Sequence, residues 1–265
     1  MKKIYLGRHV YGCAAILFGV FTLASQDFNI WQQIGPLGNV PHRAILVNLA
    51  GAVELLGGLA IQWRRTARAG AIALTSIYSI FALLWVPRIL AEPRLYDRWG
   101  NFFEQFSQIA GALIVYSTLG EDDAKPASRL ASTGYIFFGI SVVSFTLEQA
   151  FYLSATADFV PKWIPPGQMF WAVTTTIAFA LAAIALLSGR SALLASRLMT
   201  VMIVGFGLLI WLPRPFSDPH NRINWAGNAE NLSIAGAAWI VTDYLSRKRV
   251  RGTVSVPAQV VEEVA

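Results

Sequence analysis

The stretch from Trp85 to Ser107 reads WVPRILAEPRLYDRWGNFFEQFS, and the stretch from Trp211 to Ser233 reads WLPRPFSDPHNRINWAGNAENLS. The two align without a gap, and the identical positions pair Trp85, Pro87, Arg88, Pro93, Trp99, Glu104 and Ser107 with Trp211, Pro213, Arg214, Pro219, Trp225, Glu230 and Ser233. Such internal similarity indicates a duplicated unit. Because each copy joins two apolar runs, the sequence predicts a fold made of two similar halves.

The composition is that of an integral membrane protein. Of 265 residues, 55% are hydrophobic and only 14% are charged, and the mean hydropathy is +0.51. Soluble domains carry about 25% charged residues. The formal net charge of +6 does not indicate nucleic-acid binding, because the basic residues form short clusters between apolar runs and no continuous face. We therefore expect the lipid bilayer to be the main partner, with no nucleic acid.

Eight segments are long and apolar enough to be helices that cross a bilayer of about 30 Å. They lie near 9–26, 43–62, 69–88, 101–118, 131–153, 168–187, 192–212 and 229–245. The prediction is an all-α protein in which each half is a four-helix bundle. Since four is even, both halves enter the membrane from the same side, which makes the repeats parallel.

The basic clusters predict the orientation. Loops rich in Lys and Arg stay in the cytoplasm, and the more basic side of the chain carries both termini, so both are expected to be cytoplasmic. The halves are expected at 1–120 and 131–247, joined by a cytoplasmic linker at 121–130. A tail at 248–265 lacks apolar periodicity and is expected to be disordered.

Glu54 is the most unusual single residue. It lies in a predicted helix that enters from the exterior, at a depth of roughly 16 Å at 1.5 Å per residue, and a carboxylate there costs about 2.5 kcal/mol or more. Gly51 and Gly58 share its helix face and would allow close approach of a second helix, and Asn48 lies one turn above. Two interpretations stay open: a functional acid that accepts protons, or a hydrogen-bonded packing residue.

The second half has no acid at the position of Glu54. It carries Glu148 late in its first helix, where the first half has Ala24 or Ser25. A pocket between the halves would therefore be chemically asymmetric.

Glu104 and Glu230 begin equivalent helices and are followed by small and polar residues on the same helix face. One interpretation is structural: Glu104 pairs with Arg88 or Arg98, and Glu230 with Arg214 or Arg222. The other is an exterior polar vestibule that binds a ligand head group.

The tryptophans at the shoulders of the duplicated stretches have two possible roles. Trp85, Trp99, Trp211 and Trp225 could anchor the chain at the membrane interface, or they could contribute to ligand binding at the vestibule.

Metal and thiol chemistry have little support. His9, His42 and His220 are the only histidines, and no helix shows a metal-binding spacing such as HxxxH or ExxH. We expect no metal site. Cys13 is the only cysteine, which excludes a dithiol pair within the chain, so an electron carrier for any redox reaction must come from elsewhere.

The first half resembles the DoxX-like family of four-helix membrane proteins. The resemblance rests on Arg8 before the first helix, Phe18-Gly19 inside it, Gly51-Ala52-Val53-Glu54-Leu55-Leu56-Gly57-Gly58 in the second, and then Arg64 to Arg68 with Ala69-Gly70-Ala71 opening the third. The second half is similar only through the duplication, since it lacks the glutamate and the double glycine. The resemblance implies a bacterial or archaeal cytoplasmic membrane and a link to redox work, which in this family includes a membrane subunit of thiosulfate:quinone oxidoreductase.

Taken together, these features lead to one main functional hypothesis and two alternatives. The main hypothesis is an accessory redox subunit that binds a quinone or another amphipathic ligand beside Glu54 and works with an oxidoreductase partner. The first alternative is a transporter or carrier of a small molecule or lipid, because parallel repeats and intramembrane acids also suit that class. The second is a purely structural membrane subunit.

Overall fold

The structure is a computed structural model that describes residues 6–27, 40–119 and 125–254, and within these residues it contains helices and no strand. The first half comprises α1 (Gly7–Ser25), α2 (Arg43–Gln62), α3 (Ala67–Ala91) and α4 (Tyr96–Thr118). The second comprises α5 (Lys125–Phe151), α6 (Leu153–Phe159), α7 (Gln168–Ser188), α8 (Ala192–Phe206), the π-helical turn η2 (Gly207–Trp211), α9 (Arg214–Ser217) and α10 (Arg222–Val254). Each of the eight predicted apolar segments is helical, which confirms the all-α class.

Two predicted boundaries differ from the structure. α5 begins at Lys125, inside the expected linker at 121–130, because Pro126 in the first helical turn has no backbone N–H to lose and favours a helix start. α10 continues to Val254, inside the expected tail at 248–265. The remaining residues of these two segments, 121–124 and 255–265, lie outside the described residues.

The protein is a multi-pass membrane protein. Six of its described helical segments are long and apolar enough to cross a bilayer: Gly7–Ser25, Arg43–Gln62, Ala67–Ala91, Arg129–Phe151, Gln168–Ser188 and Ala192–Ser217. Large apolar side chains such as Leu56, Leu83, Leu181 and Val201 are more than 60% exposed on them, as expected for surfaces that face lipid. α4 and α10 are long but more polar, so the crossing of the membrane by all eight segments stays a prediction.

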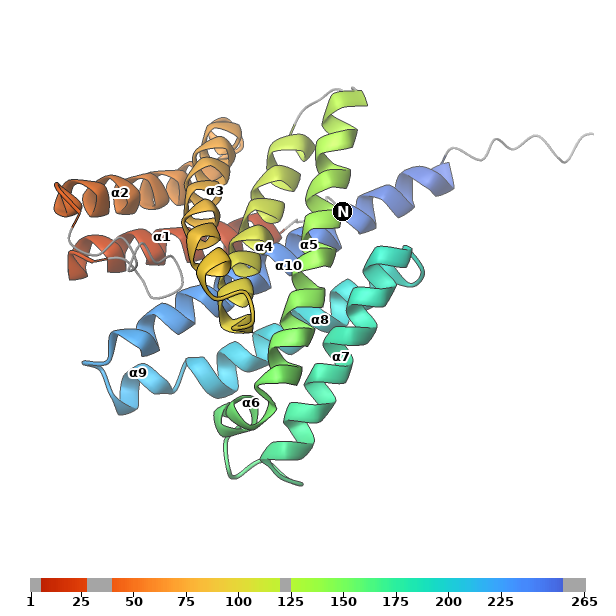
Figure 1. The fold of residues 1–265 in the computed structure, drawn as a ribbon. Helices are drawn as coiled ribbons and strands as arrows, with labels where there is room; N and C mark the ends of the chain where they lie inside the picture. Colours follow the sequence, from red (N-terminus) through yellow and green to blue (C-terminus); the bar gives the residue numbers. More distant parts are fainter. Residues whose placement is uncertain (1–5, 28–39, 120–124, 255–265) are drawn as a thin grey trace, which may run out of the picture.

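The eight long helices form a closed ring in which each helix packs on the next, and two of them, α4 and α10, also pack on each other across the ring. Along the chain, each of α1, α2, α3, α4, α5, α7, α8 and α10 packs on the next, and α10 packs back on α1. α4 and α10 also pack on each other, and Figure 1 shows α10, in blue, passing α1, α4 and α8. The halves are therefore not two separate bundles: α4 packs on α5, and α10 on α1, far more than each packs on the first helix of its own half.

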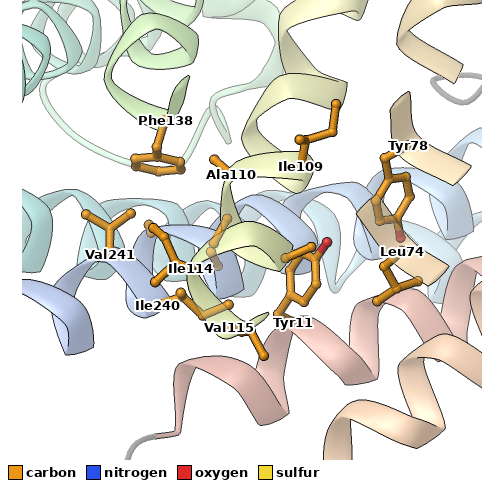
Figure 2. Close-up of a cluster of buried hydrophobic side chains, with 14 of the residues drawn as sticks. Tyr11, Leu74, Tyr78, Ile109, Ala110, Ile114, Val115, Phe138, Ile240 and Val241 are labelled. Atoms are coloured by element: carbon orange, nitrogen blue, oxygen red, sulfur yellow. The ribbon is translucent and has the colours of Figure 1, made fainter. Parts of the chain in front are cut away.

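The core lies where α1, α3, α4, α5 and α10 meet. Figure 2 shows the side chains that fill it: Tyr11, Leu74, Tyr78, Ile109, Ala110, Ile114, Val115, Phe138, Ile240 and Val241. Close helix approach depends on glycine here. A methyl group added at Gly236 of α10 would lie 2.6 Å from the backbone of Tyr11, and one added at Gly58 of α2 would lie 2.6 Å from the carbonyl oxygen of Gly12. The predicted role of Gly58 as a contact for a second helix is thus confirmed.

The duplicated stretches share two side-chain contacts. The indole N–H of Trp99 donates to the carbonyl oxygen of Pro93 at 3.1 Å, and that of Trp225 donates to Pro219 at 2.9 Å. The guanidinium of Arg88 lies 5.2 Å from the Trp85 ring centroid, and that of Arg214 lies 4.9 Å from Trp211. Arginine three residues after tryptophan lies about one helical turn away, which brings the cation over the ring.

Candidate functional site

A cavity of about 520 Å³ lies between α4 of the first half and six parts of the second half: α5, α6, α7, the end of α8, η2 and the first part of α10. Its walls are mainly apolar and include seven aromatic side chains: Phe145, Tyr152, Phe159, Trp171, Phe179, Phe206 and Trp211. Aromatic walls with a few polar groups are typical of small-molecule pockets, whose volumes run from about 300 to 1,000 Å³. The cavity is therefore large enough for a small ligand.

Three glutamates from three different helices line this cavity: Glu104 from α4, Glu148 from α5 and Glu230 from α10. Glu104 lies within electrostatic range of both others. No lysine, arginine or histidine is among the described residues that line the cavity. Three carboxyl groups without a lining cation give this space a strong preference for positive charge or for hydrogen-bond donors.

The Glu148 carboxyl group packs closely against α4 because Gly100 has no side chain there. A methyl group at Gly100 would lie 2.5 to 2.6 Å from both carboxyl oxygens of Glu148. No other residue type fits this position without moving the carboxyl group, so Gly100 sets how closely α5 brings its acid to α4.

Glu230 and Glu104 occupy equivalent positions but have different partners. The side-chain amide of Gln108 donates to both carboxyl oxygens of Glu230, at 3.1 and 3.3 Å. The residue equivalent to Gln108 in the second copy is Ile234, which has no donor to offer Glu104. Accordingly, Oε2 of Glu104 is shielded from solvent and has no hydrogen-bond partner among the described residues.

The π-helical turn η2 shapes one wall. Its wider turn carries a hydrogen bond from Leu212 N–H to the Gly207 carbonyl oxygen at 2.7 Å and places Leu209, Ile210 and Trp211 at the cavity. The Trp211 ring packs directly on Gly227 of α10, where an added methyl group would overlap it. Single π-helical turns inside α-helices are frequently found at functional sites.

The expected arginine–glutamate pairs do not form. Among the described residues, Arg98 pairs with Glu92 at 3.2 Å and with Asp97 at 3.3 Å, and neither Glu104 nor Glu230 has a basic partner. Arg214 lies over Phe159 at 4.5 Å as well as over Trp211. The predicted ion pairs are therefore absent among the described residues, and both arginines of the WxPR motifs stack on aromatic rings.

Glu54 is fully buried in α2, at 0% exposure, and does not line the cavity. Its electrostatic neighbours are the hydroxyl groups of Tyr11 and Tyr78, both of which are buried in the core of Figure 2. The Tyr11 hydroxyl donates to the Gln108 carbonyl oxygen at 2.7 Å. Gln108 therefore has two contacts of interest. Its backbone carbonyl accepts a hydrogen bond from Tyr11, a neighbour of Glu54, and its side-chain amide donates to Glu230.

The structure separates the predicted site residues into two groups. Glu104, Glu148, Trp211 and Glu230 line the cavity. The others lie elsewhere: Glu54, Asn48, Trp85, Arg88, Trp99, Arg214 and Trp225.

Two of these residues have surroundings that differ from their predicted roles. Asn48 is exposed and accepts a hydrogen bond from Gln26 at 3.2 Å, so it does not face the same buried space as Glu54. Trp85 is buried at 2% exposure, which makes it a packing residue and not an interfacial anchor.

The polar and aromatic residues of the cavity that the sequence did not single out as site residues include Asp97, Gln149, Tyr152 and Trp171. Gln149 accepts a hydrogen bond from the Thr176 hydroxyl at 3.1 Å, which ties α5 to α7. Trp171 donates to the Pro165 carbonyl oxygen at 2.9 Å, six residues earlier, as Trp99 and Trp225 do with their prolines. This recurring PxxxxxW spacing is the signal that could have identified Trp171.

No group of three or more His, Cys, Asp or Glu side chains suited to holding a metal ion is present in the part of the chain that the structure describes. Comparisons of the chain with models of protein families, with curated proteins and with solved structures found no match.

Proposed function

We propose that this protein is a membrane carrier or transporter that binds an amphipathic small molecule in the cavity lined by Glu104, Glu148 and Glu230. The observation that supports it is one space that combines aromatic walls with three carboxyl groups contributed by both halves. Aromatic walls suit the apolar body of such a ligand, and the carboxyl groups suit its polar end. The duplicated halves supply the symmetric framework that carriers commonly use.

The proposed topology places the cavity near the exterior surface. In it, all eight long helices cross the membrane and both termini are cytoplasmic. α4 and α10 are tolerated in spite of their polar residues, because their neighbours on both sides cover them. The resemblance to DoxX-like proteins suggests a bacterial or archaeal cytoplasmic membrane as the location.

The test is to recover the bound molecule. The protein is purified in a mild detergent from its native membrane, and the copurified small molecules are identified by mass spectrometry. Ala155 is an exposed lining residue, so Ala155→Trp should fill the cavity entrance and remove the bound molecule. Its neighbour Ser154 is exposed but does not line the cavity, so Ser154→Trp serves as the matched control. Recovery of no molecule, or of the same molecules from both variants, would favour a purely structural subunit.

The second candidate function is the accessory redox subunit with a bound quinone and an oxidoreductase partner. One observation favours it: Tyr11, a neighbour of Glu54, donates a hydrogen bond to the Gln108 carbonyl oxygen, and the Gln108 side chain donates to Glu230 at the cavity. Reduction of a quinone consumes protons, which buried carboxyl groups can store. A quinone among the extracted molecules, with respiratory electron transfer lowered at least tenfold in Glu54→Gln, would support this candidate in place of the carrier.

A further inference from the structure

The cavity has a polar end whose charge is not balanced by the protein. Glu104, Glu148 and Glu230 line it together with Asp97. Asp97 is paired with Arg98, Glu230 accepts from Gln108, and Glu148 rests on Gly100. Among the residues that the structure describes, Oε2 of Glu104 has no hydrogen-bond partner although solvent does not reach it. A buried carboxyl oxygen without a partner is costly, and the cavity beside it is the space from which a partner can come.

The walls around these carboxyl groups are suited to cations as well. Tryptophan and phenylalanine faces attract ammonium and guanidinium groups within about 6 Å of the ring centroid. The protein already uses two lining rings in this way, since Arg214 stacks on Phe159 and Trp211. Arg214 itself does not line the cavity.

From this geometry we infer that the ligand is an amphipathic organic cation, a protonated or quaternary amine with an apolar body, whose charged end lies beside Glu104. This inference deepens the proposed function and rests on it. The amine supplies the hydrogen-bond donor or positive charge that Glu104 lacks, because Ile234 occupies the position equivalent to Gln108. The apolar body packs against the aromatic walls.

Binding is coupled to protons in this arrangement. An incoming ammonium ion favours the ionised form of nearby carboxyl groups, so a carboxyl group that carries a proton releases it when the cation binds. The other titratable groups that face the cluster are Asp97 and Tyr96 of α4, Tyr152 between α5 and α6 and Tyr78 of α3. None of these four is a cation, and Arg214, which stacks on two lining rings, does not itself line the cavity.

The experiment compares three probes with one apolar body: 4-phenylbutylamine, 4-phenylbutanol and 4-phenylbutanoate. Binding to the full-length protein in lipid nanodiscs is measured by calorimetry in two buffers of different ionisation enthalpy, which also counts the protons released. We expect the protonated amine to bind at least tenfold more tightly than the alcohol, the carboxylate to bind least, and amine binding to weaken as the pH falls and the glutamates become protonated.

Two variants assign the effect to the site. Glu104→Gln should remove most of the tenfold preference for the amine and leave binding of the alcohol within about twofold, because glutamine keeps the shape and loses the charge. Glu92→Gln, at an exposed glutamate paired with Arg98 outside the cavity, should keep the preference.

Equal binding of amine and alcohol, or an unchanged preference in Glu104→Gln, would overturn the inference and leave the proposed function standing. Failure of all three probes to bind would overturn both.

Discussion

At the scale of single residues, two buried tyrosines in the core make a sharp contrast. The hydroxyl of Tyr11 donates to the Gln108 carbonyl oxygen, whereas the hydroxyl of Tyr78 is buried without a hydrogen-bond partner among the described residues. Tyr11→Phe should therefore lower the free energy of unfolding by about 1 kcal/mol. Tyr78→Phe should leave it unchanged or raise it, because a buried unpaired hydroxyl costs free energy. Thermal unfolding of the two purified variants gives the comparison, and equal losses would contradict it.

Gly100 offers a test of the carboxyl cluster that leaves every carboxyl group in place. Gly100→Ala must displace the Glu148 carboxyl group, so we expect binding of 4-phenylbutylamine to weaken by about tenfold or more, which corresponds to about 1.4 kcal/mol. The matched control is Gly205→Ala, since an added methyl group there meets no atom within 4 Å. Calorimetry on both variants decides the matter, and similar affinities would show that the position of Glu148 has no influence.

The sequence predicted which glutamates line the cavity better than it predicted which residues surround each of the acids. Glu104, Glu148 and Glu230 could be found because one pair repeats and the third breaks the repeat. Glu54 ranked first because its depth could be estimated from its place in the chain, but depth says nothing about which neighbours surround it. Gln149 and Tyr152 were missed because their importance arises only when α5, α6 and α7 are assembled around one space.

At the scale of helices, the duplicated stretches differ at one informative point. α3 continues through Pro87 to Ala91, whereas the corresponding second-half segment breaks into α8, η2 and α9. The second copy has a further proline, Pro215, where the first has Ile89, and proline removes a helical hydrogen bond and crowds the preceding turn. The sequence predicted one uninterrupted helix at 69–88 and one at 192–212, because the duplication hides a difference made by single residues.

The contact between α1 and α10 depends on a residue without a side chain. Gly236→Leu would push its side chain into the backbone of Tyr11, and such overpacking costs about 1 to 3 kcal/mol or more. We expect the variant to accumulate poorly in membranes and to unfold at a lower temperature. Gly205→Leu introduces the same side chain into α8, where no atom is close, and should accumulate normally. Normal yield and stability of Gly236→Leu would argue against this packing.

At the scale of the whole molecule, the predicted orientation of the chain in the membrane can be tested by chemical labelling of single introduced cysteines. Cys13 is replaced by serine, and cysteine is then introduced at Ser154, Thr66, Ser188 or Ser217, all of which are exposed. We expect a membrane-impermeant maleimide to label positions 154 and 217 in intact cells, and positions 66 and 188 only after permeabilisation, because the basic loops stay in the cytoplasm. Labelling of 66 or 188 in intact cells would contradict this topology.

The ring of helices also has a consequence for how the protein is made. α10 lies far after α1 in the chain, and the two helices pack on each other. At the usual rate of about 5 to 20 residues per second, α1 waits roughly 10 to 40 seconds for this partner. During that interval the face of α1 around Gly7 and Tyr11 lacks its contact with α10, so the nascent protein depends on lipid or on an insertion factor to cover it. In a chain truncated before α10, this face of α1 would stay uncovered. We expect such a chain to be degraded.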